Sequence, residues 1–284
     1  MKNLVIKSYA KINLCLNVVG KREDGYHNLD MVMLPLELHD SVLFTELKSA
    51  PDHYVTIDDF SLGLFKYNTA TTAINLLQEK YGFTNRFRVS IHKVIPMQAG
   101  LGGGSSNAAT VINAVDKYLN LNMSEQEKID IAVQVGADVP FFISSKPARC
   151  RGVGEKIDFI NLKNDYYVLI VKPVVGCSTE KVFKLSDTMD LKIGNVEDVI
   201  KALEEGDDVK LAQSICNSLE PAAISLVPEI QVIIDKLKMH GLNIVQMSGS
   251  GSAVFAMSTD KKLIKNVAKE LEKEYLVELT KVLK

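Results

Sequence analysis

One glycine-rich segment constrains this chain more than any other feature. It runs Pro96-Met-Gln-Ala-Gly-Leu-Gly-Gly-Gly-Ser-Ser-Asn107, between a stretch with strand periodicity and one with helix periodicity. Phe87, Val89 and Ile91 alternate with other residues before it. After it, apolar residues recur at helical spacing, namely Ala108, Val111, Ile112, Val115 and Leu119. A glycine turn at a helix N-terminus offers bare N–H groups and the positive end of a helix dipole, so we predict a phosphate-binding loop.

The order of residues in this loop differs from that of two other nucleotide-binding turns. A Walker loop ends in Gly-Lys-Ser/Thr, whereas Gly104 is followed directly by Ser105. A dinucleotide fingerprint needs a glycine where Ser105 stands, in a strand-turn-helix unit at the start of its domain. A plain flexible turn before a helix is the simpler alternative, and the length of the string argues against it.

Length and composition indicate a globular protein of two modest domains. The 284 residues are 46% hydrophobic and 24% charged, as in ordinary soluble proteins. A formal net charge of −2 argues against a nucleic-acid or anionic-membrane partner. No apolar run reaches the roughly 18 residues that span a bilayer. Lysines at positions 2, 7 and 11 interrupt any signal-peptide core, so we expect a cytoplasmic location.

The cysteines and histidines indicate no structural metal site. The four cysteines stand far apart without a Cys-x-x-Cys pair, at Cys15, Cys150, Cys177 and Cys216. The five histidines show no ligand spacing either. We therefore expect reduced thiols and no metal held by side chains alone. Any magnesium should arrive with a nucleotide, held largely by phosphates and water.

The periodicity predicts an α+β chain in two parts, residues 1–160 and 161–284. A polar patch over 161–165 precedes a strongly apolar strand over 166–171 and marks the boundary. Strands and helices mix without the regular alternation of a doubly wound sheet. Helices are predicted over 68–81, 124–135, 196–204, 207–218 and 228–240, and from about 260. Further strands are predicted over 243–247, over 253–257 and at the C-terminus.

Two polar constellations lie near the N-terminus. In a strand over residues 10–18, Lys11 and Asn13 project together from the face opposite the apolar residues. A solvated outer face is the simpler interpretation of this pair. The turn signal Asp24-Gly25 then presents Tyr26 and His27 at a loop edge. Such a tyrosine caps the core or stacks on a flat ring, and nucleobases stack well on aromatic faces.

Two further strings carry polar groups. In Gly136-Ala-Asp138-Val-Pro140 a helix stop and a proline hold a carboxylate on a rigid connection. Capping of the next turn is the simpler interpretation of Asp138, and a positioned base is the alternative. The segment from Met247 to Ala253 alternates serine and glycine between two predicted strands. It predicts either a tight hairpin or a set of backbone amides that contact a phosphate.

Taken in order, these strings resemble the GHMP small-molecule kinases along nearly the whole chain. The loop alone carries the family signature. The strings Ala10-Lys-Ile-Asn13, Asp24-Gly-Tyr-His27 and Gly136-Ala-Asp-Val-Pro140 narrow the resemblance to members that act on a cytidine-diphosphate-linked methylerythritol. The resemblance implies a mixed α/β nucleotide-binding N-terminal domain and a ferredoxin-like C-terminal domain. It also implies ATP-dependent phosphorylation of the 2-hydroxyl of that substrate in the non-mevalonate isoprenoid pathway, by a monomer or homodimer.

The resemblance further implies catalytic and ATP-binding roles for residues of this chain. Asp138 would accept the hydroxyl proton, and Lys11 would orient that carboxylate and steady the developing charge. Either of the loop serines would lie near magnesium. The ATP-binding residues would be Asn68, Lys93, Pro96, Met97, Gln98, Ala99, Gly100, Leu101, Gly102, Gly103, Gly104, Ser105, Ser106 and Asn107. Asn68 departs from the family pattern because Thr69 follows it where a larger apolar residue is expected.

The substrate site implied by the resemblance draws on both parts of the chain. The cytosine would sit between Tyr26 and Phe183, with His27 contacting its polar edge. The remaining contacts would come from Asn13, Thr179, Gly249 and Gly251. Phe183 matches only as an aromatic residue four positions after Thr179. Two alternatives stay open: a GHMP kinase acting on homoserine, mevalonate or a sugar, and a non-catalytic nucleotide-binding sensor.

Overall fold

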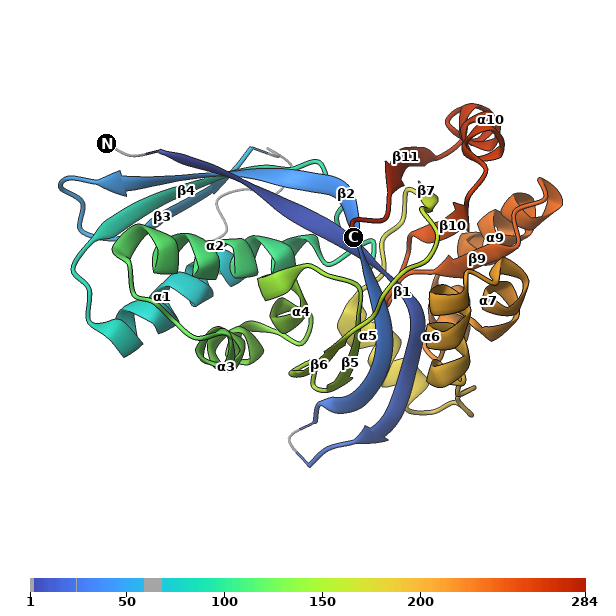
Figure 1. Ribbon diagram of the computed structural model, residues 1–284, viewed down its shortest axis with the longest axis horizontal. Helices are drawn as coiled ribbons and strands as arrows, with labels where there is room; N and C mark the ends of the chain where they lie inside the picture. Colours follow the sequence, from blue (N-terminus) through green and yellow to red (C-terminus); the bar gives the residue numbers. More distant parts are fainter. Residues whose placement is uncertain (1–2, 24, 59–67) are drawn as a thin grey trace. The chain divides into compact units, whose positions relative to one another are not determined.

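The chain packs as two compact units. The computed structural model describes residues 3–23, 25–58 and 68–284 (Figure 1). The first unit comprises Met1–Ala10, His39–Ile95 and Gly102–Ser145, and the second comprises Lys11–Leu38, Pro96–Leu101 and Lys146–Lys284. The units interleave because two long strands contribute residues to both, namely β1 (Leu4–Lys21) and β2 (His27–Leu47). The domain boundary near residue 160 stays a prediction from the sequence.

The first unit is built on strand segments in the order β3-β4-β2-β1. Here β3 is Tyr54–Ile57 and β4 is Arg86–His92. Strand β4 pairs antiparallel with β2 and parallel with β3. The three alternating residues of β4 are all buried, as predicted, at Phe87, Val89 and Ile91. The glycine-rich loop therefore begins at the end of a strand with one apolar face.

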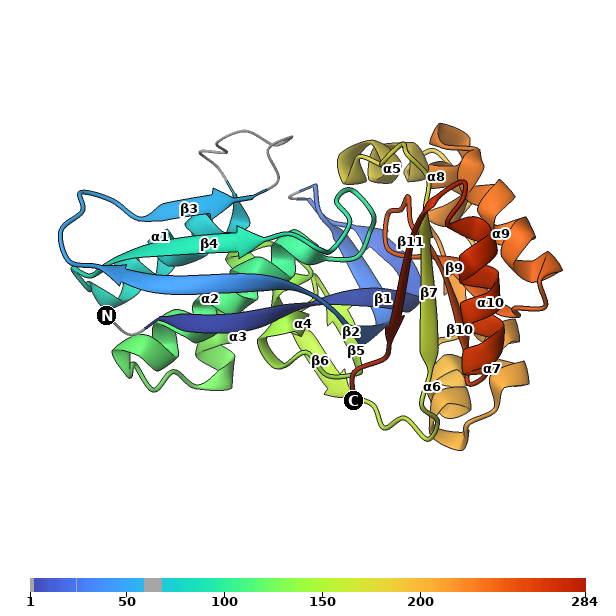
Figure 2. The same cartoon turned by 90° about the horizontal axis from the view of Figure 1, so that it is seen from above.

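Four helices cover one face of these strands (Figures 1 and 2). They are α1 (Thr69–Tyr81), α2 (Gly103–Leu119), α3 (Glu125–Val135) and α4 (Val139–Ser144). The predicted capping box of α3 is confirmed, since Ser124 and Glu127 bond reciprocally. Asn68 caps α1 through a hydrogen bond from Thr71 N to its Oδ1 of 2.8 Å. Local capping signals thus fix where these helices begin.

The second unit contains a four-stranded antiparallel sheet in the order β11-β7-β10-β9. These strands are β7 (Tyr167–Lys172), β9 (Ile244–Met247), β10 (Val254–Ser258) and β11 (Leu276–Lys281). Helices α9 (Glu229–Met239) and α10 (Lys261–Leu271) lie along one face of this sheet (Figure 2). The predicted hairpin over 243–257 is confirmed by the β9–β10 pairing.

The rest of the second unit consists of short elements. Strands β5 (Ala148–Gly152) and β6 (Lys156–Phe159) extend from β2, and β8 (Cys216–Asn217) pairs with β1. The helices are α5 (Thr179–Ser186), α6 (Val196–Glu205), α7 (Asp208–Ser214) and α8 (Glu220–Leu226). The predicted helix over 207–218 is wrong at its end, because Ser218 N donates to Leu16 O in the ladder with β1. In the described ranges no helix is long and apolar enough to cross a bilayer.

Candidate active site

The second half of the glycine-rich loop lies in the first unit and begins α2. Gly102 stands at the N-cap in a left-handed conformation, with φ 70°, and the helix start carries no side-chain cap. Its first turn, from Gly103 to Ser106, contains no acidic residue. The N–H groups of this turn lie at the N-terminus of a 17-residue helix, and no side chain of the described residues caps them. Such an end favours an anion.

The two loop serines differ in accessibility. Ser106 is 1% exposed, and its Oγ accepts a hydrogen bond from Ser8 Oγ at 2.8 Å. Ser105 is half-buried. Of the two predicted neighbours of magnesium, Ser105 is therefore the hydroxyl that a ligand reaches more easily. Across residues 3–23, 25–58 and 68–284 no group of three His, Cys, Asp or Glu side chains forms a metal site.

The first half of the loop, residues 96–101, packs against the β9–β10 hairpin of the second unit. Gln98 O accepts hydrogen bonds from Cys177 N at 3.3 Å and Ser252 N at 3.2 Å. Ser248 Oγ donates to Gly100 O at 3.0 Å. The serine–glycine string is thus both a hairpin turn and a direct neighbour of the loop. The first half of the glycine-rich loop and the serine–glycine string over 247–253 are therefore in direct contact.

The hairpin turn also lies over Lys11. Gly249 has φ 55°, and a Cβ there would lie 3.1 Å from Lys11 Nζ. Asn217 Nδ2 holds the turn by donating to the carbonyl oxygens of Met247 at 2.9 Å and Gly249 at 2.8 Å. Asn217 belongs to no motif, so the sequence does not predict this role. Its role depends on β8 lying beside the hairpin.

Lys11 and Asn13 form a buried polar pair. Their exposed fractions are 2% and 0%, and Lys11 Nζ donates to Asn13 Oδ1 at 2.5 Å. Lys11 N also donates to Leu101 O at 3.0 Å, which joins β1 to the loop. The expectation of a solvated outer face is therefore wrong. Burying an ammonium is costly without compensating partners, so Lys11 is a candidate functional residue.

His27 and Phe183 come together in the second unit. Their rings stack with centroids 4.9 Å apart and an interplanar angle of 27°. His27 Nε2 lies 2.7 Å from Asp187 Oδ1, and Lys21 Nζ donates to Asp187 Oδ2 at 2.5 Å. The Lys21 ammonium and the His27 ring hold the pKa of the Asp187 carboxyl below its ordinary value. Asp187 lies one turn after Phe183 and belongs to no motif, so the sequence does not predict its contact with His27.

The neighbours of this aromatic pair are placed as follows. Tyr26 is 64% exposed. Thr179 begins α5 and its Oγ1 lies 2.8 Å from Ser250 Oγ in the hairpin turn. Asp24, which completes the motif in the sequence, lies outside the described residues.

Asp138 occupies the N-cap position of α4 in the first unit. Its backbone is helical, with φ −85° and ψ −12°, and its side chain makes no capping hydrogen bond to α4. Pro140 lies in the first turn of α4, where its lack of an N–H group costs no helical hydrogen bond. The interpretation of Asp138 as a side-chain cap is therefore wrong. The half-buried carboxylate stands on a rigid connection, as a positioned base would.

Asn68 and Lys93 both take part in contacts that hold the first unit together. Asn68 caps α1, and its neighbour Thr69 donates from Oγ1 to Gly104 O at 2.7 Å. The Lys93 side chain is 10% exposed and its ammonium pairs with the carboxylate of Asp40. Both residues lie beside the start of α2, where the family resemblance predicts an ATP site.

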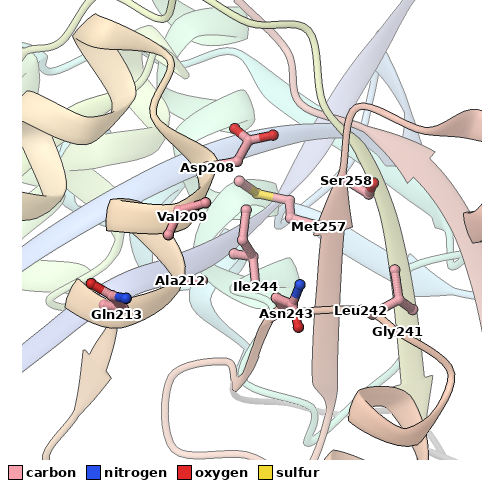
Figure 3. Close-up of a pocket in the computed structure, with 10 residues that line it drawn as sticks. All are labelled: Asp208, Val209, Ala212, Gln213, Gly241, Leu242, Asn243, Ile244, Met257 and Ser258. Atoms are coloured by element: carbon pink, nitrogen blue, oxygen red, sulfur yellow. The ribbon is translucent and has the colours of Figure 1, made fainter.

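A separate pocket of about 420 Å³ opens in the second unit beside α7, β9 and β10 (Figure 3). It is lined by Asp208, Val209, Ala212, Gln213, Gly241, Leu242, Asn243, Ile244, Met257 and Ser258. None of these described lining residues was predicted as a site residue. The Asp208 carboxylate accepts hydrogen bonds from Tyr166 Oη at 2.7 Å and Asn164 Nδ2 at 3.3 Å. This acidic group therefore holds α7 in place.

Comparison with protein families gives two matches along the chain. Residues 68–146 match the N-terminal domain of the GHMP kinases, and residues 199–277 match their C-terminal domain. The first match covers the helix cap at Asn68, the glycine-rich loop and Asp138. The second covers the β9–β10 hairpin.

Individual proteins resemble the chain over most of its length. It is 36% identical to the 4-diphosphocytidyl-2-C-methyl-D-erythritol kinase of Caldicellulosiruptor bescii, over 90% of each chain. It is 36% identical to the protein of that name from Thermoanaerobacter pseudethanolicus, over 97% of this chain and 94% of that one. A crystal structure of 4-(cytidine 5'-diphospho)-2C-methyl-D-erythritol kinase superposes with a TM-score of 0.81 at 30% identity, covering 99% and 100%. Homoserine kinase from Cytophaga hutchinsonii superposes with a TM-score of 0.80 at 17% identity, covering 100% of this chain and 95% of that one, and shows the shared fold alone.

Proposed function

This chain belongs to the GHMP kinase family, and we propose on that basis that it phosphorylates the 2-hydroxyl of 4-diphosphocytidyl-2-C-methyl-D-erythritol with ATP in the non-mevalonate isoprenoid pathway. It is a small-molecule kinase. The observation that carries the proposal is the glycine-rich start of α2, where no side chain of the described residues caps the helix and the first turn holds no acidic residue. A cytoplasmic location and a monomeric or homodimeric state remain proposals from the sequence.

In this proposal the loop and the start of α2 bind the phosphates of ATP. Phosphoryl transfer depends mainly on positioning and on charge stabilisation, which backbone N–H groups and a helix dipole supply. Magnesium would come with ATP, held by phosphate oxygens and water, with Ser105 as the nearby hydroxyl. When bound, the cation would neutralise charge on the transferred phosphoryl group. Asn68 and Lys93 would support the nucleotide from the adjoining elements.

For the transfer itself, the protein would supply a carboxylate that accepts a proton and a lysine ammonium that stabilises negative charge. As the substrate oxygen bonds to the γ-phosphorus, the bond to the β-phosphate oxygen of ATP breaks and ADP leaves. Asp138 would accept the hydroxyl proton in this step and later release it to water. Lys11 would steady the negative charge that develops, and Asn13 would hold both Lys11 and the acceptor. The buried Lys11–Asn13 hydrogen bond of 2.5 Å keeps the ammonium in one direction.

The cytosine would bind at the aromatic residues of the second unit. Tyr26 offers an exposed ring, and Phe183 is held by its stack on His27. Asp187 contacts the imidazole at Nε2 and orients the ring. Thr179, Gly249 and Gly251 would contact the diphosphate from the hairpin side.

Replacing Tyr26 by Ala is expected to raise KM for the cytidine substrate about tenfold and to leave kcat within about twofold. A stacked base contributes about 1–3 kcal/mol, and an exposed ring contributes little to the fold. Steady-state kinetics on the purified variant measure both constants. Tyr54→Ala, which removes an exposed tyrosine from β3 in the first unit, is the control and should change neither. An unchanged KM in Tyr26→Ala would place the stacking residue elsewhere.

The function is tested by following ADP release with magnesium-ATP and a panel of acceptors. The panel contains 4-diphosphocytidyl-2-C-methyl-D-erythritol, free methylerythritol phosphate, homoserine and mevalonate. Turnover confined to the cytidylated acceptor is the expected result. Turnover on another acceptor would keep the kinase and discard the cytosine site. ATP binding without turnover on any acceptor would favour the nucleotide sensor.

A further inference from the structure

One carboxylate of the first unit accepts hydrogen bonds from two segments of the chain, residues 93–95 and Asn107. Asp40, in β2, is 0% exposed. Its Oδ1 accepts from Val94 N at 2.8 Å and from Ile95 N at 2.9 Å. Its Oδ2 accepts from Asn107 Nδ2 at 2.9 Å and from the Lys93 ammonium. Both oxygens of this buried carboxylate are therefore engaged by donors that belong to the loop or flank it.

These donors stand on the two sides of the glycine-rich loop. Val94 and Ile95 come directly before Pro96, while Asn107 lies in α2 just after the loop. Ser8 extends the network, because its Oγ accepts from Asn107 Nδ2 and donates to Ser106 Oγ, both at 2.8 Å. Asp40 thus connects the entry of the loop to the first turns of the helix that ends it.

The ammonium of Lys93 lies directly beneath the first residue of α2. A Cβ at Gly103 would lie 3.1 Å from Lys93 Nζ and 3.2 Å from Ile95 Cγ2. Lys93 Nζ also donates to Asn107 Oδ1 at 3.3 Å. The first residue of α2 therefore packs against Lys93, and Lys93 is held by its ion pair with Asp40.

The ion pair between Lys93 and Asp40 also limits how strongly the lysine charge attracts an anion. The Lys93 side chain is 10% exposed and the Asp40 side chain is 0% exposed, so neither charge is solvated well. A buried ion pair is locally neutral, and loss of one partner leaves an uncompensated charge. The attraction for an anion at this end of the unit therefore comes from the backbone N–H groups of α2 more than from Lys93.

We propose that Asp40 is a positioning residue for ATP, acting through Lys93, Asn107 and the amides of Val94 and Ile95 to fix the direction of the N–H groups that begin α2. It does not touch the nucleotide. This inference rests on the proposed phosphate-binding role of the loop. Since a shift of an oriented donor weakens charge stabilisation steeply, small movements of this helix start should be visible in ATP binding.

The test replaces Asp40 by Asn. The amide oxygen can still accept from the two backbone N–H groups, but an NH₂ group now faces the donors of Lys93 and Asn107. KM for ATP is expected to rise at least about tenfold, and the increase in melting temperature produced by ATP is expected to shrink. KM for the acceptor should stay within about twofold. This split between the two KM values would not follow from a role in folding alone.

Asp116→Asn is the matched control. Asp116 also pairs with a lysine, Lys128 at 2.6 Å, and accepts from a backbone amide, Met123 N at 3.0 Å, in the same unit. It lies at the far end of α2 from the loop, near Leu119. This variant is expected to melt at a lower temperature with an unchanged KM for ATP. A rise in KM for ATP as large as that in Asp40→Asn would overturn the specific role of Asp40.

A second variant keeps the inference testable if Asp40→Asn does not fold. The double variant Asp40→Asn/Lys93→Met leaves no uncompensated buried charge, so it should fold more readily than the single one. Its KM for ATP should exceed that of Lys93→Met alone, which keeps the contacts of Asp40 to Val94 N, Ile95 N and Asn107. A folded variant of either kind with wild-type ATP affinity overturns the inference. Failure of the wild-type chain to bind ATP would instead overturn the proposed function of the loop.

Discussion

Replacing Asp138 by Asn is expected to lower kcat by about 10²–10⁴, with KM for ATP and for the acceptor close to the wild-type values. The amide keeps the shape of the side chain but cannot accept the hydroxyl proton, and a general base contributes about this factor. The fold should be retained, because asparagine has nearly the size and shape of aspartate. Steady-state kinetics and thermal melting on the same preparation separate the two effects.

Asp130→Asn serves as the control for this variant. Asp130 is an exposed carboxylate on α3 in the same unit, where its Oδ1 accepts only a side-chain hydrogen bond from Gln126 at 2.8 Å. Its loss should change neither kcat nor the melting temperature appreciably. Near-normal turnover in Asp138→Asn would refute the assignment of the base and leave the family fold in place.

Features encoded by neighbouring residues were predictable from the sequence. The capping box at Ser124 and Glu127 and the alternation in β4 depend on residues a few positions apart. The resemblance to the GHMP kinases likewise rests on short, contiguous strings. Such signals identify the loop and nominate candidate site residues, but they do not say which segments lie against one another.

Features that depend on distant strands were not predictable. The face of β1 that carries Lys11 reads as solvated until the hairpin turn at Gly249 is known to cover it. Asp40 stands in no motif, and its partner Asn107 is 67 residues away. Asp187 and Asn217 also act across large separations, on His27 and on the hairpin. Each is an ordinary polar residue whose role is set by topology.

Gly100→Ala is expected to remove measurable ATP binding, raising KM for ATP by at least about 10². Gly100 has φ 72°, which side-chain-bearing residues rarely adopt. A Cβ there would overlap the carbonyl oxygen of Ser248 and would lie 2.8 Å from its carbonyl carbon and 3.0 Å from Gly251 N. The turn cannot move aside easily, because Ser248 O already accepts from Gly251 N at 2.9 Å. The loop must therefore shift, and with it the donors for phosphate.

Gly104→Ala is the matched variant that separates crowding from general damage to the loop. Gly104 lies within α2, and a Cβ there would meet only Thr69 Oγ1 at 3.6 Å, an ordinary contact. Alanine is favoured over glycine in a helix by about 1 kcal/mol, so this variant should melt at or above the wild-type temperature. Gly100→Ala should melt several degrees lower, since overpacking against backbone costs about 1–3 kcal/mol. Wild-type ATP affinity in Gly100→Ala would mean that the contact between Gly100 and the hairpin turn plays no part in nucleotide binding.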